Sequence, residues 1–440
     1  MIISCKDRVG LLGPKRGNPA VIIPYFCSGR KCGRAAIIGG VKLKILVVNA
    51  GSSSLKYQLL DMENESVLAK GICERIGTSG KISHKVADGR KFEAEIPMPT
   101  HTEAFQCLVD ALTKGELKVI DSMSEISAVG HRIVQGGAIF SKSTLVDDKV
   151  IEQISDLAEL APLHNAAHVL GIKACIAALG KDVPEVVVFD TSFHQTMPAR
   201  AYMYPIPYEY YEKYKVRRYG FHGTSHRYVS DRCAELMGKP KKDLKIVTCH
   251  LGNGCSISAI KDGVCIDTSM GFTPLDGLMM GTRTGTMDPS VLTFIAEKEN
   301  MSPKEMDDMC NKKSGLLGVS GLSNDSRDVN NAAREGNERC RLAVDMQQYE
   351  VAKYVGSYIA AMNGIDALVF TGGIGENDPG MREYVSGQLG FLGVAIDLEK
   401  NKLRGEEVEL STPESKVKVW VIPTNEELVI ARDTLALISK

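Results

Sequence analysis

From Lys44 onward, short hydrophobic runs rich in β-branched residues alternate with longer stretches whose apolar positions recur every three or four residues. The short runs predict strands and the longer stretches predict helices. The predicted strands cover residues 44–49, 55–61, 67–73, 126–134 and 185–190, and the predicted helices cover residues 101–114, 149–160 and 166–179. This alternation favours an α/β fold in which helices cover a sheet.

The first two strands frame a turn of small residues at positions 50–54. Free N–H groups and hydroxyls in such a turn suit phosphate oxygens, and small side chains let a ligand approach the backbone. Asn49 ends the first strand and offers a carboxamide oxygen to a metal or its water, while Lys56 adds a positive charge for phosphate. On shape alone, an ordinary hairpin with a polar turn remains the alternative.

A second half begins around Thr191 and repeats this strand–turn–strand pattern at residues 245–260, with a third strand at 265–268. The repeated pattern suggests an internal duplication. The remaining predicted elements are a long helical stretch at residues 330–362, strands at 367–371 and 417–421, and a closing helix at 426–438.

Composition narrows the class of protein. A chain of 440 residues predicts two domains, and a hydrophobic content of 44% with 24% charged residues is typical of a globular protein. The net charge of −1 provides no general attraction to nucleic acid or an anionic membrane, and no apolar run is long enough for a membrane helix. Twelve scattered cysteines without a secretory signal favour reduced thiols in the cytoplasm. Cys27 and Cys32 could form half of a metal site, but no second half follows.

Residues 1–41 differ from the rest, because seven Lys and Arg residues accompany a single acid, Asp7. We expect a disordered extension or a non-native start before Val41 rather than a targeting leader, because Ser enrichment and clear amphipathicity are missing.

Nucleotide chemistry is indicated by glycine-rich turns. No G-x-x-x-x-G-K-[ST] sequence occurs, which excludes a Walker-type NTPase, and Ile257 replaces the third glycine of a dinucleotide fingerprint. Two other glycine-rich turns, at residues 250–254 and 371–377, directly follow predicted strands. Each alone is more often structural, but together with the hairpin at 49–56 they favour phosphate binding.

Two arginines and an aspartate are candidates for the reacting centre. Arg132 lies at the end of a predicted buried strand, and Arg283 is flanked by glycines that leave its guanidinium uncrowded. Such a planar fork can bind carboxylate or phosphate bidentately, although a lone Arg more often forms a structural ion pair. Asp190 ends another apolar strand, where a carboxylate could position a metal or cap the next turn.

The string NAGSSSLKYQLLD, which begins at Asn49, and the string YGFHGTSH, which begins at Tyr219, resemble the signatures of the acetate kinase family. Further motifs resemble it in the same order over nearly all of residues 44–440. The resemblance implies two duplicated actin/hexokinase-like (ribonuclease H-like) domains around a central cleft. Residues 42–191, completed by 426–440, would form the first domain, and residues 192–425 the second.

The resemblance also implies the reaction, which is reversible transfer of the γ-phosphoryl group of ATP to acetate with Mg²⁺, or Mn²⁺ in its place. It assigns catalysis to Asp190, His222 and Arg283. Because acetate is already ionised at neutral pH, we expect Asp190 to orient groups rather than act as a general base. His222 would donate a hydrogen bond to the phosphoryl oxygens.

The family match assigns binding roles to the remaining candidates. The substrate-binding residues would be Arg132, Val134, Leu163, His164, Phe221 and Pro274. The ATP-binding residues would be Lys56, His250, Leu251, Gly252, Asn253, Gly254, Asp325, Ser326, Arg327, Gly373, Ile374, Gly375, Glu376 and Asn377. The metal ligands would be Asn49 and Glu426, and the family implies a homodimer.

Substrate preference follows from the size of the acyl pocket. Val134 is bulky enough to favour acetate, although one methylene is worth only about 1–3 kcal/mol. Two departures from the family pattern bear on rate and preference, namely Gln135 in place of His, and Thr286-Met287 in place of Asp-Ile. The alternatives are a propionate or butyrate kinase, a non-catalytic nucleotide-binding module of the heat-shock ATPase type, and a sugar kinase, whose expected sugar-binding Asp is missing.

Overall fold

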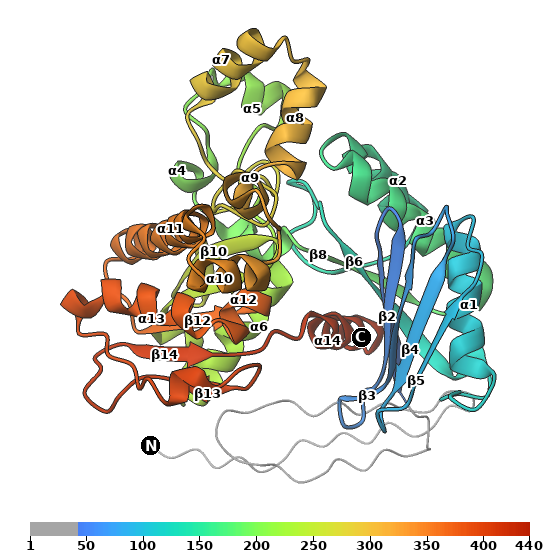
Figure 1. Ribbon diagram of the computed structural model, residues 1–440. Coiled ribbons are helices and arrows are strands. Elements are labelled where there is room, and N and C mark those ends of the chain that lie inside the picture. Colours follow the sequence, from blue (N-terminus) through green and yellow to red (C-terminus); the bar gives the residue numbers. More distant parts are fainter. Residues whose placement is uncertain (1–42) are drawn as a thin grey trace, which may run out of the picture.

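The computed structural model describes residues 43–440 and contains two mixed sheets (Figure 1). The predicted extension at residues 1–41, including Cys27 and Cys32, lies outside the described residues. The first sheet has the strand order β5-β4-β3-β2-β1-β6-β8-β7. Its strands are β1 (Lys44–Ala50), β2 (Ser54–Asp61), β3 (Ser66–Glu74), β4 (Lys81–Val86), β5 (Lys91–Glu95), β6 (Ile126–Ile133), β7 (Thr144–Leu145) and β8 (Glu185–Phe189).

Helices α1 (His101–Thr113) and α3 (Pro162–Leu179) cover one face of this sheet, and α2 (Asp148–Asp156) packs on α3. The core strand β1 is buried along almost its whole length, as its run of β-branched and aliphatic residues predicts. Thr100 begins α1 with a capping box that includes Glu103.

The second sheet has the order β11-β10-β9-β12-β14-β13. Its strands are β9 (Lys245–Leu251), β10 (Cys255–Lys261), β11 (Val264–Thr268), β12 (Ala367–Thr371), β13 (Val408–Glu409) and β14 (Lys418–Val421). Helix α6 (Gly223–Leu236) contacts β9 and β12, and α11 (Glu338–Met362) contacts β9 and β10. The other helices of this half are α4 (Ala199–Tyr202), α5 (Glu209–Tyr214), α7 (Pro289–Glu299), α8 (Pro303–Lys312), α9 (Gly315–Ser320), α10 (Ser326–Arg334), α12 (Gly372–Asn377) and α13 (Pro379–Gln388).

The two sheets share one topology. In the first, β3, β2 and β1 are antiparallel neighbours, and β6 and β8 follow in parallel. In the second, β11, β10 and β9 are antiparallel neighbours, and β12 and β14 follow in parallel. The predicted duplication and α/β fold class are therefore confirmed.

The last helix, α14 (Glu426–Ile438), returns to the first sheet, where it packs on β1, β6 and β8 and also contacts α6 (Figure 1). Gly130 in β6 permits this close approach, because an added Cβ would lie only 2.6 Å from Ile430 Cγ2. Helices α6 and α14 thus contact each other at the boundary between the two halves.

The predicted strands and helices match the observed ones within a few residues, with one error. The single helix predicted at residues 330–362 is wrong, because α10 ends at Arg334 and α11 begins at Glu338. Gly336 has a φ of 96° at the break, and Asn337 caps the new helix through its side chain. Among residues 43–440, no helix has both the length and the apolar character needed to cross a membrane.

Candidate active site

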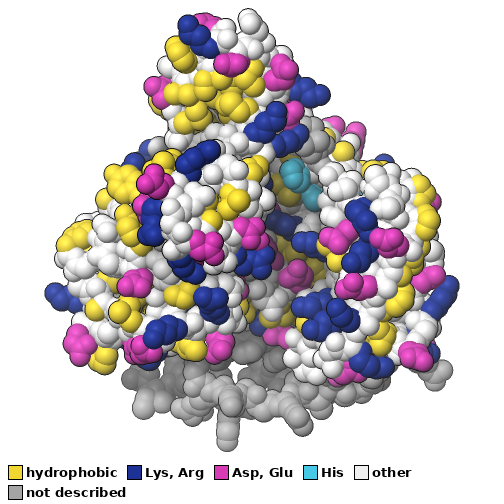
Figure 2. All heavy atoms as spheres, viewed as in Figure 1, with side chains coloured by type: hydrophobic (Ala, Val, Ile, Leu, Met, Phe, Trp, Pro, Cys, Tyr) yellow, Lys and Arg dark blue, Asp and Glu magenta, His cyan; other side chains and the backbone are white. Residues whose placement is uncertain are grey.

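The carboxyl ends of three parallel strands gather the first group of predicted residues. Because β1, β6 and β8 are parallel neighbours, Asn49, Arg132 and Asp190 lie at the same edge of the sheet. Figure 2 shows that the surface is hollowed between the two halves, and that histidine and charged side chains lie in the hollow.

Arg132 and Asp190 form a two-pronged ion pair. Arg132 Nε donates to Asp190 Oδ1 at 2.9 Å, and Nη2 donates to Oδ2 at 2.7 Å. Burial by itself would lower the pKa of Arg132, but Asp190, Glu426 and Glu427 raise it above its ordinary value. The Nε edge of the guanidinium is therefore occupied, and the Nη1–Nη2 edge remains for a second anion.

Glu426 lies beside this pair at the start of α14. Its Oε1 atom is buried without a hydrogen-bond partner among the described residues. Burial, reinforced by Asp190 and Glu427, raises the pKa of Glu426 to about 7, although Arg132 and Lys56 oppose the shift. Such an unpaired carboxylate oxygen is suited to a cation.

Lys56 and Asn49 line a neighbouring pocket of about 400 Å³ together with Glu427. The pairing of β1 with β2 places Asn49 opposite Lys56, so the predicted hairpin is confirmed. A cationic and a carboxamide side chain therefore lie next to the acidic first turn of α14.

His222 brings the second half to this site. It precedes α6 in a left-handed conformation, with φ 58° and ψ 24°, which is costly for a residue other than Gly and is often found at functional positions. The next residue, Gly223, donates its backbone N–H to Asp190 O at 2.9 Å, and an added Cβ would lie 2.2 Å from the same oxygen. Only Gly lets the start of α6 meet the end of β8.

Arg283 approaches His222 from a loop. A Cβ added to Gly254 would lie 3.5 Å from Arg283 Nη1 and 3.6 Å from His222 Nε2, so both groups flank the turn after β9. Nη1 donates to Pro274 O at 3.1 Å, and no carboxylate pairs with Arg283 among residues 43–440. Burial lowers the pKa of Arg283, which makes an anion a suitable partner.

The two arginines act on the same histidines. His164 keeps an exposed surface, but partial shielding from water lowers its pKa, and Arg132 and Arg283 lower it further. Burial holds the pKa of His222 well below its usual value, and four neighbouring groups add to this effect: His250, Arg132, His226 and Arg283. The groups predicted from distant parts of the sequence therefore share one electrostatic environment.

A larger cavity of about 790 Å³ is lined by Gly252 and Asn253, which belong to the same turn as Gly254. Eight predicted ATP-binding residues line it: Gly252, Asn253, Asp325, Ser326, Arg327, Gly373, Ile374 and Asn377. Sequence reasoning missed the other lining residues, which belong to no recognised motif: Asn324, Asn330, Asn331, Arg334, Asp378, Pro379 and Arg404. The turn thus connects this cavity to Arg283 and His222.

Other predicted ATP-binding residues lie behind or beside the cavity. The Leu251 side chain is buried in the hydrophobic core, and Gly375 is buried beneath the loop. Glu376 Oε1 accepts from Gly372 N at 2.9 Å, so it holds the backbone of the loop. His250 stacks on His222 at 4.2 Å between ring centroids and thus lies beside Gly254.

The predicted acyl pocket is partly described. Val134 and Phe221 are buried in one hydrophobic cluster, and His164 is exposed. The side chain of Leu163 lies outside the described residues. Gln135 is fully buried, and its Oε1 accepts from Gly137 N at 2.9 Å.

Thr286 supports the loop of Arg283. Its hydroxyl contacts Asp276 Oδ1 at 2.5 Å and Tyr354 Oη at 2.9 Å. This departure from the family pattern therefore lies in the support of the loop rather than against the reacting groups.

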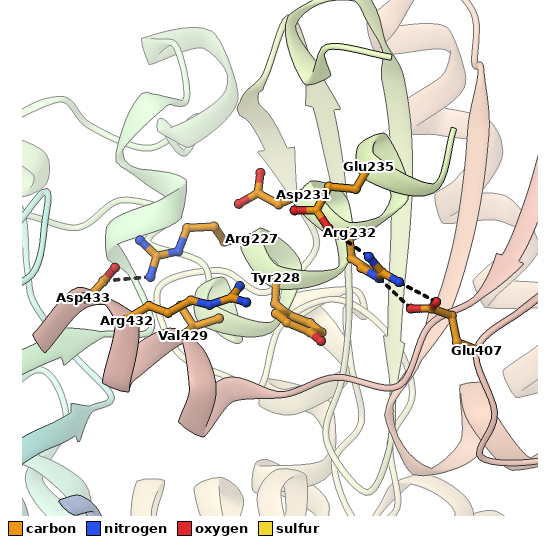
Figure 3. A pocket seen from close by; sticks show the side chains of 9 residues that line it. All are labelled: Arg227, Tyr228, Asp231, Arg232, Glu235, Glu407, Val429, Arg432 and Asp433. Atoms are coloured by element: carbon orange, nitrogen blue, oxygen red, sulfur yellow. Dashed lines mark hydrogen bonds and ion pairs between the residues drawn. The ribbon is translucent and has the colours of Figure 1, made fainter. Parts of the chain in front are cut away.

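A further pocket of about 430 Å³ lies between α6 and α14 (Figure 3). Its three arginines are all paired: Arg227 with Asp433, Arg232 with Glu407 and Glu235, and Arg432 with Glu65. Because these cations are neutralised, the pocket lacks the free positive charge that distinguishes the cleft around Arg283.

Comparison with known proteins covers nearly all of the described chain. Residues 44–432 match the family model described as the acetokinase family. An acetate kinase of Halothermothrix orenii is 55% identical over 397 residues, which cover 90% of this chain and 100% of the relative. The crystal structure of Porphyromonas gingivalis acetate kinase has a TM-score of 0.87 and 47% identity, covering 90% of this chain and 100% of that one.

A propionate kinase structure from Francisella tularensis subsp. tularensis SCHU S4 is also similar, with a TM-score of 0.84 and 42% identity. It covers 90% of this chain and 99% of its own. Both sequence and fold therefore relate this chain to kinases that are named for short carboxylic acids.

Proposed function

Because this chain belongs to the acetokinase family, we propose that it transfers the γ-phosphoryl group of ATP to acetate, reversibly, to give acetyl phosphate and ADP. The observation that carries the proposal is Arg283, a partly buried guanidinium without a carboxylate partner among the described residues. Arg283 and His222 both lie beside Gly254, in the turn whose residues Gly252 and Asn253 line the large cavity.

In this proposal, each side chain has a separate role in phosphoryl transfer. Asp190 fixes Arg132, whose free Nη1–Nη2 edge binds the acetate carboxylate. Arg283 and His222 stabilise charge on the transferring group, because preorganised donors in a partly buried site act strongly on developing charge. Since both Asp190 oxygens accept from Arg132, the aspartate positions the site and removes no proton.

ATP occupies the cavity of about 790 Å³ with its phosphates directed over the turn at residues 252–254. Because Gly254 of this turn lies beside Arg283 and His222, phosphates bound over the turn would reach both groups, which supports in-line transfer. Lys56 adds positive charge on the side of the first sheet.

The donors at the sheet edge fit Mg²⁺. Glu426 has a buried, unpartnered Oε1, and Asn49 offers a carboxamide oxygen, and oxygen ligands are those that Mg²⁺ prefers. Glu426 and Asn49 would hold the ion through direct or water-mediated contacts. When bound, Mg²⁺ neutralises negative charge on the phosphates.

A second candidate substrate is propionate, which the similar propionate kinase structure supports. The test is to supply ATP and Mg²⁺ with formate, acetate, propionate or butyrate and to trap the acyl phosphate with hydroxylamine. We expect kcat/KM to be highest for acetate and about 10- to 200-fold lower for propionate, because Val134 limits the pocket. Equal or higher values with propionate would reassign the substrate, and no trapped product with any acid would refute the enzyme activity.

We also propose that the protein forms a homodimer and that it is located in the cytoplasm. Leu342, Met346 and Tyr349 form an exposed stripe along one face of α11, with side chains 53%, 38% and 57% exposed, which supports a homodimer. All nine described cysteines are free thiols, which supports a reducing cytoplasmic compartment.

A further inference from the structure

A chain of hydrogen bonds runs behind His222, through side chains that have no assigned role. Thr248 Oγ1 lies 2.7 Å from His226 Nδ1, and His226 Nε2 lies 2.7 Å from Ser256 Oγ. The same Ser256 Oγ lies 2.9 Å from His222 Nδ1. Thr248, His226 and Ser256 are fully buried.

The number of hydrogen atoms on these side chains determines which group donates and which accepts in each hydrogen bond. Burial, together with His194 and His250, holds the pKa of His226 well below its usual value, and the pKa of His222 is also lowered, so each ring carries one proton. Ser256 has a single hydroxyl hydrogen, so it donates to one ring and accepts from the other.

Thr248 decides between the two directions. Its buried hydroxyl has no other partner among the described residues, so its hydrogen must go to His226 Nδ1. His226 then carries its own proton on Nε2 and donates it to Ser256. Ser256 donates in turn to His222 Nδ1. In the opposite direction, the Thr248 hydroxyl hydrogen would be buried without an acceptor.

We propose that Thr248, His226 and Ser256 are positioning residues that hold neutral His222 with its proton on Nε2, facing Gly254 and Arg283. This inference rests on the proposed phosphoryl transfer, because only a protonated Nε2 can donate to a phosphoryl oxygen.

The same assignment of hydrogens applies to the neighbouring ring of His250. Ser225 Oγ lies 2.7 Å from His250 Nδ1, and its hydroxyl has no other partner among the described residues. Its hydrogen therefore goes to Nδ1, and His250 also carries its proton on Nε2. Two stacked, neutral imidazoles thus direct their N–H groups away from the hydroxyls that hold them.

The tautomer can be measured without any assay of activity. In the full chain labelled with ¹⁵N-histidine, the resonances of His222 are assigned by their loss in His222→Gln. We expect a protonated Nε2 and an unprotonated Nδ1 at neutral pH. A proton on Nδ1 in the wild type would overturn the proposal even if the enzyme is active, whereas an inactive enzyme with the expected tautomer would count against the proposed function alone.

Kinetics then tests the role of the chain. Ser256→Ala should lower kcat about 10- to 100-fold, leave KM for acetate within about twofold, and allow His222 to populate both tautomers. Ser258→Ala is the matched control, because Ser258 is equally buried in β10 but bonds to Thr268. Thr248→Ser should retain kcat and the tautomer, while the isosteric Thr248→Val should lower kcat. An unchanged kcat and tautomer in Ser256→Ala would refute the positioning role.

Discussion

At the scale of single residues, the unpaired guanidinium of Arg283 distinguishes the cleft from every other arginine cluster described above. Arg132 is pinned by Asp190, and the arginines of the pocket between α6 and α14 are all neutralised. Among the described residues, the only acceptors of the Arg283 guanidinium are Pro274 O and Met280 Sδ, both of which accept from Nη1, so its remaining N–H donors are available to an anion.

Arg283→Ala should therefore lower kcat by about 10³- to 10⁵-fold, because an arginine acting on a transferring phosphoryl group contributes that much. Steady-state assays with saturating ATP and acetate provide the measurement. Arg90→Ala is the control, because Arg90 forms an exposed ion pair with Asp88. A kcat within about tenfold of the wild type, with folding intact, would remove Arg283 from the reacting centre.

The sequence indicated candidate residues, but it did not indicate the contacts between them. Arg132 and Asp190 were both candidates, but their pairing joins positions 58 apart in sequence and depends on the parallel register of β6 and β8. The sequence therefore could not indicate that Asp190 occupies one edge of the Arg132 guanidinium.

At the scale of elements, one buried arginine holds the glycine-rich loop after β12. Arg382 of α13 is fully buried and donates to Gly375 O at 3.0 Å, to Leu403 O at 2.9 Å, and to both the side chain and backbone of Asn401. Helix α12 is thereby joined to the segment at residues 401–404, and both border the cavity of about 790 Å³ through Asn377 and Arg404.

Arg382→Lys should raise KM for ATP about tenfold while KM for acetate changes less than about twofold, because a single ammonium cannot reproduce four spread donors. Arg382→Met should also lower the free energy of unfolding, since it leaves buried carbonyl groups without donors at about 1–3 kcal/mol each. Substrate titrations and urea denaturation measure the two effects. Equal increases in both KM values would show that the loop does not act on ATP alone.

Hydrophobic periodicity predicted the strands of the two repeated cores, because these strands are buried, but it gave no helix at the position of α6. It missed β4 and β5, which extend the first sheet beyond the repeat, and it joined α10 to α11. β5 is mostly exposed and is rich in Lys and Glu, so it lacks the alternation that marks a strand. The break between α10 and α11 depends on the positive φ of one residue, Gly336, which the hydrophobic pattern does not indicate.

At the scale of the whole molecule, the duplicated halves are joined where the ends of β8, α6 and α14 meet. The contact of Gly223 with Asp190 joins the halves through backbone atoms, and the histidines behind it are buried. The groups proposed to act on the phosphoryl group therefore lie at the interface that joins the two halves.

Buried histidines make the stability of the protein sensitive to acid. Burial lowers the pKa of His194 to about 4, of His250 to about 4 and of His168 to about 3, and it lowers the pKa of His222 and His226 as well. Between pH 6.5 and about 4 the unfolded chain therefore binds protons at these five rings that the folded chain does not. Glu426, with its pKa raised to about 7, acts in the opposite direction, but it is one group against five, so the free energy of unfolding falls as pH falls.

Denaturant midpoints measured between pH 7.5 and pH 5 should decrease steadily, with each such histidine contributing up to about 1.4 kcal/mol per pH unit. Variants with Gln in place of His194 should show a shallower decrease than the wild type. A midpoint that is independent of pH over this interval would contradict the neutral, buried state of these rings.

The central claim is that donors from both halves converge on one transferring phosphoryl group. It is tested most directly by a crystal structure of the enzyme with ADP, Mg²⁺, acetate and aluminium fluoride, which mimics the planar group in transfer. We expect the fluoride to contact Arg283 and His222 Nε2, the acetate to contact the Nη1–Nη2 edge of Arg132, and the ion to lie near Glu426 and Asn49. Fluoride and acetate bound at separate places, with Arg283 and His222 touching neither, would contradict the account.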